Sequence, residues 1–99
     1  MFTNFTLDQF RADMLAQGYD EVLERKWTPG TVIDLHQHDF EANAIVVQGE
    51  MVLAVEGEGE RTLKIGDRFH LQPGTWHTET YSATEGATYW VARKRASAS

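Results

Sequence analysis

From Gly18 onward, short runs rich in apolar and β-branched residues are separated by turn residues, a pattern that predicts β-strands. Pairs such as Pro29-Gly30, Gly66-Asp67 and Pro73-Gly74 mark the turns. We expect eight strands of five to eight residues, at Glu21–Trp27, Thr31–His36, Asn43–Gln48, Met51–Glu56, Arg61–Ile65, Arg68–Gln72, His77–Tyr81 and Ala87–Lys94.

The segment before Gly18 has a different period. Apolar residues recur at helical spacing from Leu7, which predicts an amphipathic helix. Thr6 can cap this helix, and Gln9 follows at the spacing of a capping box. We therefore expect a helix from about Leu7 to Gln17, ended by Gly18 and packed on a sheet or on a partner subunit.

The order of these elements favours an all-β domain. Glu58-Gly59 lies between two apolar runs and predicts a hairpin. No helical crossover segment separates the strands, so we do not expect a parallel sheet. Short strands with regular turns are typical of a sandwich or barrel. We expect one domain over residues 1–99, with a helix at about 7–17, a barrel at about 21–94 and a disordered tail at 96–99.

Composition narrows the function classes. The formal net charge is −6, which disfavours a nucleic-acid partner. No apolar run approaches the roughly 20 residues of a membrane span, and the first residues lack the pattern of a signal peptide. The absence of cysteine excludes disulfides and thiolate metal sites and fits a reducing cytoplasm. We expect a cytoplasmic protein without a membrane partner, and a homodimer because the domain is small.

Three histidines stand out as the residues that carry chemistry. His36 and His38 are two positions apart, so on a strand they point to the same face. His77 follows the turn at Pro73-Gly74 and begins another strand that could aim it at the first two. Three imidazoles that converge form a site for a divalent transition metal.

The surrounding residues carry a family resemblance over about half of the chain. Two motifs that flank a hairpin resemble those of the cupin superfamily: Gly30, His36-Gln37-His38 and Gly49, then Gly66-Asp67 and Pro73-Gly74-Thr75-Trp76-His77. The resemblance implies a small jelly-roll β-barrel with a short N-terminal helix. It also implies one divalent metal held by His, His and Glu of the first motif and His of the second. His36, His38 and His77 match the three histidines.

The carboxylate of the first motif has no direct match. Glu41 comes one residue too early, and the expected positions hold Ala42 and Asn43. Glu41 and Asn43 would share a strand face, so Glu41 could still reach the metal, or Asn43 could offer an oxygen. Alternatively, the metal has three histidine ligands and water. Tyr81 stands where the family often has asparagine, which changes the lining of the cavity.

The sequence leaves the function open between two main classes. One is a metal-dependent enzyme, such as a dioxygenase or isomerase, acting on a small molecule, with Glu41 or Tyr81 as catalytic candidates. The other is a non-catalytic barrel that binds or senses a metal or small ligand. The ion would be Fe, Zn, Ni or Mn. A metal-free barrel, with its histidines bonded to water and carboxylates, is a third hypothesis. We expect His70 to lie at the surface or to support a ligand rather than to bind the metal itself.

Overall fold

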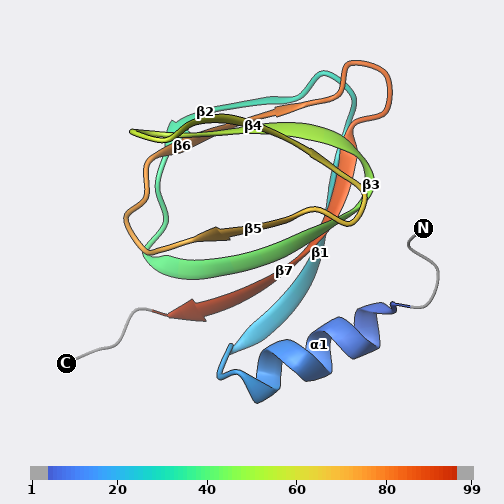
Figure 1. Ribbon diagram of the computed structural model, residues 1–99, viewed down its shortest axis with the longest axis vertical. Helices are drawn as coiled ribbons and strands as arrows, with labels where there is room; N and C mark the ends of the chain where they lie inside the picture. The colour runs from blue at the N-terminus through green and yellow to red at the C-terminus, as the bar shows by residue number, and fades with distance from the viewer. Residues whose placement is uncertain (1–4, 96–99) are drawn as a thin grey trace.

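One helix and seven strands make up the computed structural model, which describes residues 5–95 (Figure 1). The tail expected at residues 96–99 lies outside the described residues. Every strand pair is antiparallel. The elements are α1 (Leu7–Ala16), β1 (Glu21–Trp27), β2 (Val32–His36), β3 (Phe40–Val55), β4 (Gly59–Lys64), β5 (Arg68–Leu71), β6 (His77–Tyr81) and β7 (Ala87–Arg95).

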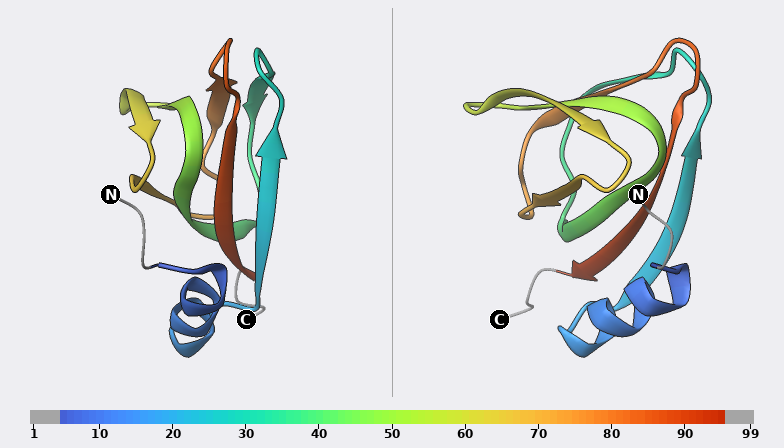
Figure 2. Two further views of the ribbon diagram at one scale, coloured as in Figure 1. Left: turned by 90° about the vertical axis from the view of Figure 1, so that its right-hand side faces the viewer. Right: turned by 45° about the vertical axis from the view of Figure 1, so that its right-hand side comes forward.

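The predicted helix is confirmed, together with its start signal. The Thr6 side chain accepts a hydrogen bond from the backbone N–H of Gln9, and the Gln9 side chain accepts one from the N–H of Thr6. Phe10 and Met14 are buried against Trp90 and its neighbours on the outer face of the sheet that contains β1 and β7 (Figure 2). Within residues 5–95 no helix is long and apolar enough to cross a bilayer.

The long strand β3 belongs to both sheets and closes the roll. Its first part pairs with β7 and β5, and its second part, Glu50–Val55, pairs with β4 and β6. β1 extends the first sheet beside β7, and β2 extends the second beside β6. The result is the small jelly-roll barrel expected from the sequence (Figure 1). The hairpin expected at Glu58-Gly59 joins β3 to β4.

The structure corrects the division of β3 into two strands with a turn between them. At Gly49 the chain takes a φ of +74° without reversing, and the register shifts between Val46 and Gln48. A Cβ added at Gly49 would lie 2.1 Å from the carbonyl oxygen of Gly86. A Cβ added at Gly86 would lie 2.1 Å from the carbonyl oxygen of Trp27. Glycine therefore lets three backbones meet where β3 passes between the sheets.

Alternation along β3 decides which side chains face the barrel interior. Ala42, Ala44 and Val46 belong to the core inside the barrel, whereas Ile45 packs outside, beneath the helix. After the register shift the order reverses, and Met51 and Leu53 face the interior. The bulge thus keeps apolar residues inside both halves of one strand.

Candidate metal centre

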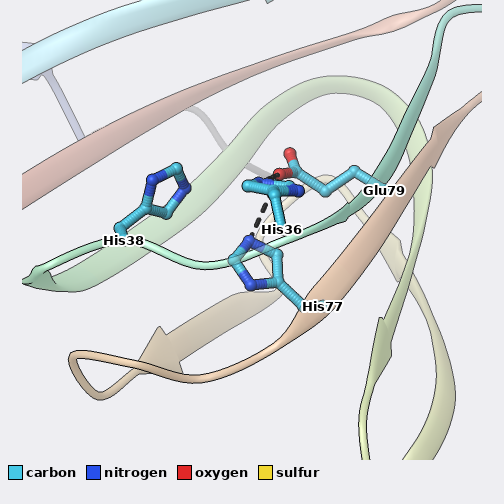
Figure 3. A group of neighbouring side chains, drawn as sticks. All are labelled: His36, His38, His77 and Glu79. Atoms are coloured by element: carbon cyan, nitrogen blue, oxygen red, sulfur yellow. Dashed lines mark ion pairs between the residues drawn. The ribbon is translucent and has the colours of Figure 1, made fainter.

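Three histidines and one carboxylate converge inside the barrel. His36 ends β2 and pairs across the sheet with His77, which begins β6. His38 follows two residues after His36, and Glu79 follows two residues after His77. One ligand atom from each of these four side chains lies within 4.8 Å of the other three (Figure 3). The pairing of β2 with β6, together with the i, i+2 spacing of His77 and Glu79 on β6 and of His38 just beyond the end of β2, therefore brings all four donors to one point.

Glu79 is the carboxylate of this group. Its side chain is buried, with Oε2 lying 3.3 Å from Nε2 of His36 and 3.5 Å from Nε2 of His77. The hydroxyl of Tyr81 donates a hydrogen bond to the other oxygen, Oε1. A buried carboxylate needs partners of this kind to remain ionised.

Backbone carbonyls fix the orientation of two imidazoles. Nδ1 of His36 lies 2.7 Å from the carbonyl oxygen of Asp34, and Nδ1 of His77 lies 2.8 Å from that of Thr75. Because a carbonyl only accepts, each Nδ1 must carry a hydrogen. In the neutral rings both Nε2 lone pairs then face Glu79. Such an arrangement needs a proton or a cation between the donors, and it is the usual way in which proteins orient metal-binding histidines.

The spacing of the donors suits a metal ion. Ligands about 2.0–2.2 Å from a common ion stand roughly 3.0–3.5 Å from one another. The distances from His36 and His77 to Glu79, 3.3 and 3.5 Å, are of this size. Nitrogen and carboxylate donors without thiolate are compatible with several first-row transition metals. The residues present therefore fit the group that the sequence resemblance implies.

The pKa shifts of Glu79 and His38 favour metal binding, whereas that of His77 makes a proton compete with the ion. Burial raises the pKa of Glu79, but hydrogen bonds from His77 and Tyr81 outweigh it and hold the pKa below its ordinary value. Burial and the charges of His36 and His77 lower the pKa of His38. For His77, burial lowers the pKa, but the hydrogen bond to Glu79 raises it above the ordinary value. The ionised Glu79 thus favours a proton on His77, and a bound cation would have to displace that proton.

A cavity of about 230 Å³ adjoins the donors. It is smaller than the pockets that hold drug-sized ligands, so it suits a small molecule. All four donors line it, and most of the other lining side chains are aromatic or aliphatic. These other residues are Leu23, Arg25, Trp27, Ile33, Phe40, Ala42, Phe69, Leu71, Tyr89, Val91 and Arg93.

The structure does not bring Glu41 to the histidines. Ala42 lines the cavity, so alternation along β3 turns Glu41 and Asn43 to the outer face. There, Glu41 Oε2 lies 2.5 Å from Nε2 of His70 and accepts a hydrogen bond from the hydroxyl of Tyr19 at 3.0 Å. Asn43 donates to the same hydroxyl at 3.4 Å. The two residues share a face, as expected, but it is the face away from the cavity.

Tyr81, the other catalytic candidate, does not face the cavity in which a substrate would bind. Its side chain is 2% exposed, and it is not among the residues that line the cavity. It sits behind Glu79 and stacks on Trp27 with ring centroids 5.4 Å apart. Tyr81 therefore holds the carboxylate in place. Glu79 was missed from the sequence, although the spacing rule that paired His36 with His38 also places Glu79 beside His77.

Comparison with known protein families identifies one match. The family described as "Cupin domain" matches residues 24–92, a range that includes His36, His38, His77 and Glu79. A comparison with curated protein sequences finds no match.

Solved structures share the fold. KdgF from Halomonas sp. is 28% identical, with a TM-score of 0.64 over 76% of this chain and 68% of that one. A structure described as DMSP lyases RdDddP and RnDddQII matches at 21% identity and a TM-score of 0.69, over 76% of this chain and 38% of that one. The Drosophila melanogaster CENP-C cupin domain matches at 16% and 0.64, over 74% and 59%. The last two likenesses show the fold alone.

Proposed function

The chain belongs to the cupin family, and from that premise we propose that it binds one divalent transition metal ion through His36, His38, His77 and Glu79. We further propose that the bound ion acts on a small molecule held in the adjoining cavity. The observation that carries both proposals is the convergence of two oriented Nε2 atoms and a buried carboxylate on one point. The ion would be Fe, Zn, Ni or Mn, since three imidazoles and one carboxylate suit each of them.

The chain supplies the setting for that chemistry. When bound, such an ion polarises a substrate oxygen or takes part in redox chemistry. Tyr81 fixes Glu79, and the carbonyls of Asp34 and Thr75 fix two of the rings. Most of the remaining cavity wall is apolar, which lowers the local dielectric constant and strengthens electrostatic interactions inside it.

A second function, non-catalytic binding of a metal or small ligand, is favoured by a specific observation. Within residues 5–95 the cavity is lined by no carboxylate or histidine other than the four donors. Tyr89 is the remaining lining residue with a titratable proton, and burial raises its pKa. A general base separate from the donors is therefore lacking in this part of the chain, and fold alone does not decide between the two functions.

The first experiment measures metal content in protein purified without chelating resin and dialysed against a defined metal mixture. We expect one equivalent in the unmodified protein and less than about a tenth of that in His77→Ala and Glu79→Gln, since even residues that only support ligands change affinity by roughly 10–100-fold. His70→Ala and Glu41→Gln are matched controls, because they alter the same residue types outside the cavity. Absence of metal from the unmodified protein, or equal loss in the controls, would overturn the proposal.

Catalysis is then tested separately from binding. Metal-loaded protein is screened for turnover of small molecules, with oxygen uptake as one readout, and Glu79→Gln serves as the inactive comparison. Turnover that depends on the ion would support the enzyme. Stoichiometric metal with no turnover across the screen would favour the binding barrel.

A further inference from the structure

Two arginines line the cavity, and the metal proposal uses neither. Arg25 lies on β1 and Arg93 on β7, in the sheet other than the one in which β2 and β6 pair, and all four metal donors line the same cavity. Leu23 and Trp27 line the same cavity, so alternation along β1 puts Arg25 on the face that looks inward. A guanidinium cannot lose its proton in a protein, so both positive charges are permanent.

Arg25 has no anionic partner within residues 5–95. Its guanidinium carbon lies 5.0 Å from the centre of the Trp27 ring, and no ion pair or hydrogen bond engages its N–H groups. Trp27 in turn stacks on Tyr81, which bonds to Glu79. Arg25 is also exposed, so it stands at the opening of the cavity. Its position is fixed by an aromatic ring while its donors remain available.

Arg93 is only partly satisfied. Its Nη2 lies 2.9 Å from Oε2 of Glu21, but its Nε is buried and has no hydrogen-bond partner. The guanidinium carbon lies 5.0 Å from the centre of the Phe40 ring, and that ring stacks on His38 with centroids 4.6 Å apart. A single aromatic ring therefore separates Arg93 from a metal donor, and one of its buried donors lacks an acceptor.

The cavity lining is rich in positive charge, although the chain as a whole is negatively charged. The protein carries 15 acidic and 9 basic residues, yet the cavity wall holds two arginines and one carboxylate. That carboxylate, Glu79, is already engaged by His36, His77 and Tyr81. A divalent ion at the donors would add further positive charge. The cavity thus carries excess positive charge, which an anionic ligand from outside the chain would balance.

We propose that the ligand of this cavity is a small carboxylate, whose oxygens are bound by the unpaired donors of Arg25 and whose apolar body lies against the aromatic walls. Arg93 lies four register positions further along the same pair of strands and adds a second positive charge to the cavity. This inference rests on the proposed function, because it names the class of molecule that would lie beside the ion. The planar fork of a guanidinium matches a carboxylate, and the apolar lining favours a carbon skeleton over a free inorganic anion.

The test uses benzoate, its neutral isostere benzamide, and inorganic phosphate, with binding followed by calorimetry or NMR on metal-free and metal-loaded protein. We expect benzoate to bind at least about tenfold more tightly than benzamide or phosphate, since hydrogen bonds to charged groups are the strong ones. Arg25→Gln should remove most of this preference. Lys26→Gln is the control, because it removes the same charge from the neighbouring position on β1, outside the cavity lining.

Arg93→Gln and Arg93→Lys form a second pair, with a thermal melt to confirm folding. Arg93→Gln should weaken benzoate binding less than Arg25→Gln does, and Arg93→Lys should retain most of the binding because it keeps the positive charge. Equal binding of benzoate and benzamide, or benzoate binding that survives in Arg25→Gln, would overturn the inference. Metal content is measured on the same samples, so failure to bind the ion and failure to bind the carboxylate are recorded separately.

Discussion

Two groups of histidine and glutamate, one inside the barrel and one outside, make an instructive comparison. The inner group combines His36, His38 and His77 with Glu79. The outer group pairs His70 with Glu41 and adds the hydroxyl of Tyr19. The same residue types occur in both, and in each a tyrosine donates to the glutamate.

The difference lies in how many donors converge and what surrounds them. On the inside, β6 contributes His77 and Glu79, and the end of β2 with the residues that follow it contributes His36 and His38, so four donors meet beside a cavity. On the outside, β3 and β5 contribute one residue each, and His70 is 46% exposed. The two charges of the outer pair balance each other, whereas the inner group needs a cation or proton to be stable. Direction relative to the sheet, rather than residue type, separates the candidate metal site from an ion pair on the outer face.

The largest expected effect concerns heat stability. Zinc or nickel at about 100 times its Kd should stabilise the protein by about 2.7 kcal/mol, which corresponds to a rise in Tm of roughly 10–20 °C for a domain of this size. His36→Ala should abolish the rise, and His70→Ala should retain it. Differential scanning fluorimetry with and without EDTA measures both. A rise that persists in His36→Ala would move the binding site away from the inner group.

A smaller effect should follow loss of the hydroxyl behind each glutamate. Tyr81→Phe removes the donor to Glu79, and we expect metal affinity to fall by about tenfold. Tyr19→Phe removes the equivalent donor to Glu41 and should leave metal affinity unchanged, at a cost of about 1 kcal/mol in the free energy of unfolding. Competition with a chromophoric chelator measures the affinities. An equal loss of affinity in both variants would erase the contrast between the groups.

The smallest effect is a pH dependence that belongs to the outer group. The hydrogen bond from His70 lowers the pKa of Glu41 and outweighs its partial burial. A carboxyl whose pKa is depressed in the folded state stabilises the protein above its unfolded pKa, near 4.5, and loses that contribution as the pH falls through the folded value. For a partly exposed pair we expect about 0.2–1 kcal/mol.

Glu41→Gln tests this dependence in metal-free protein, so that the inner donors do not contribute through an ion. Urea unfolding should show the variant less stable than the unmodified protein at pH 6, with the difference shrinking as the pH is lowered toward 3. A difference that stays constant over this range would mean that the carboxylate charge of Glu41 contributes nothing.

Local signals in the sequence predicted most of the fold. The capping box at Thr6 and Gln9, the hairpin at Glu58-Gly59 and the limits of β1 and β6 are all confirmed, because each depends on neighbouring residues. The continuity of β3 could not be predicted in this way. Gly49 has the composition of a turn, and only its contact with Gly86, far along the chain, shows that the strand continues.

The residues of the candidate site likewise fall into those that local sequence predicts and those that only the tertiary structure reveals. The convergence of His36, His38 and His77 followed from spacing and motif, and the structure brings the three rings together. The direction of Glu41 depended on which face of β3 turns inward, and sheet pairing decides that face. Glu79 could have been predicted from spacing, because it stands two residues after His77 on one strand and therefore shares its face. The arginines of the cavity required the tertiary structure, because β1 and β7 approach the site from opposite ends of the chain.

The stacked backbones at Gly49 and Gly86 carry a consequence for the way this protein tolerates mutation. Neither residue lines the cavity, yet a single methyl group at either position would collide with a neighbouring carbonyl. In a saturation screen scored by metal binding, both glycines should therefore be as intolerant as the histidines. Variants of the glycines would disappear from the soluble fraction, while variants of the histidines would remain there as folded protein that does not bind the ion.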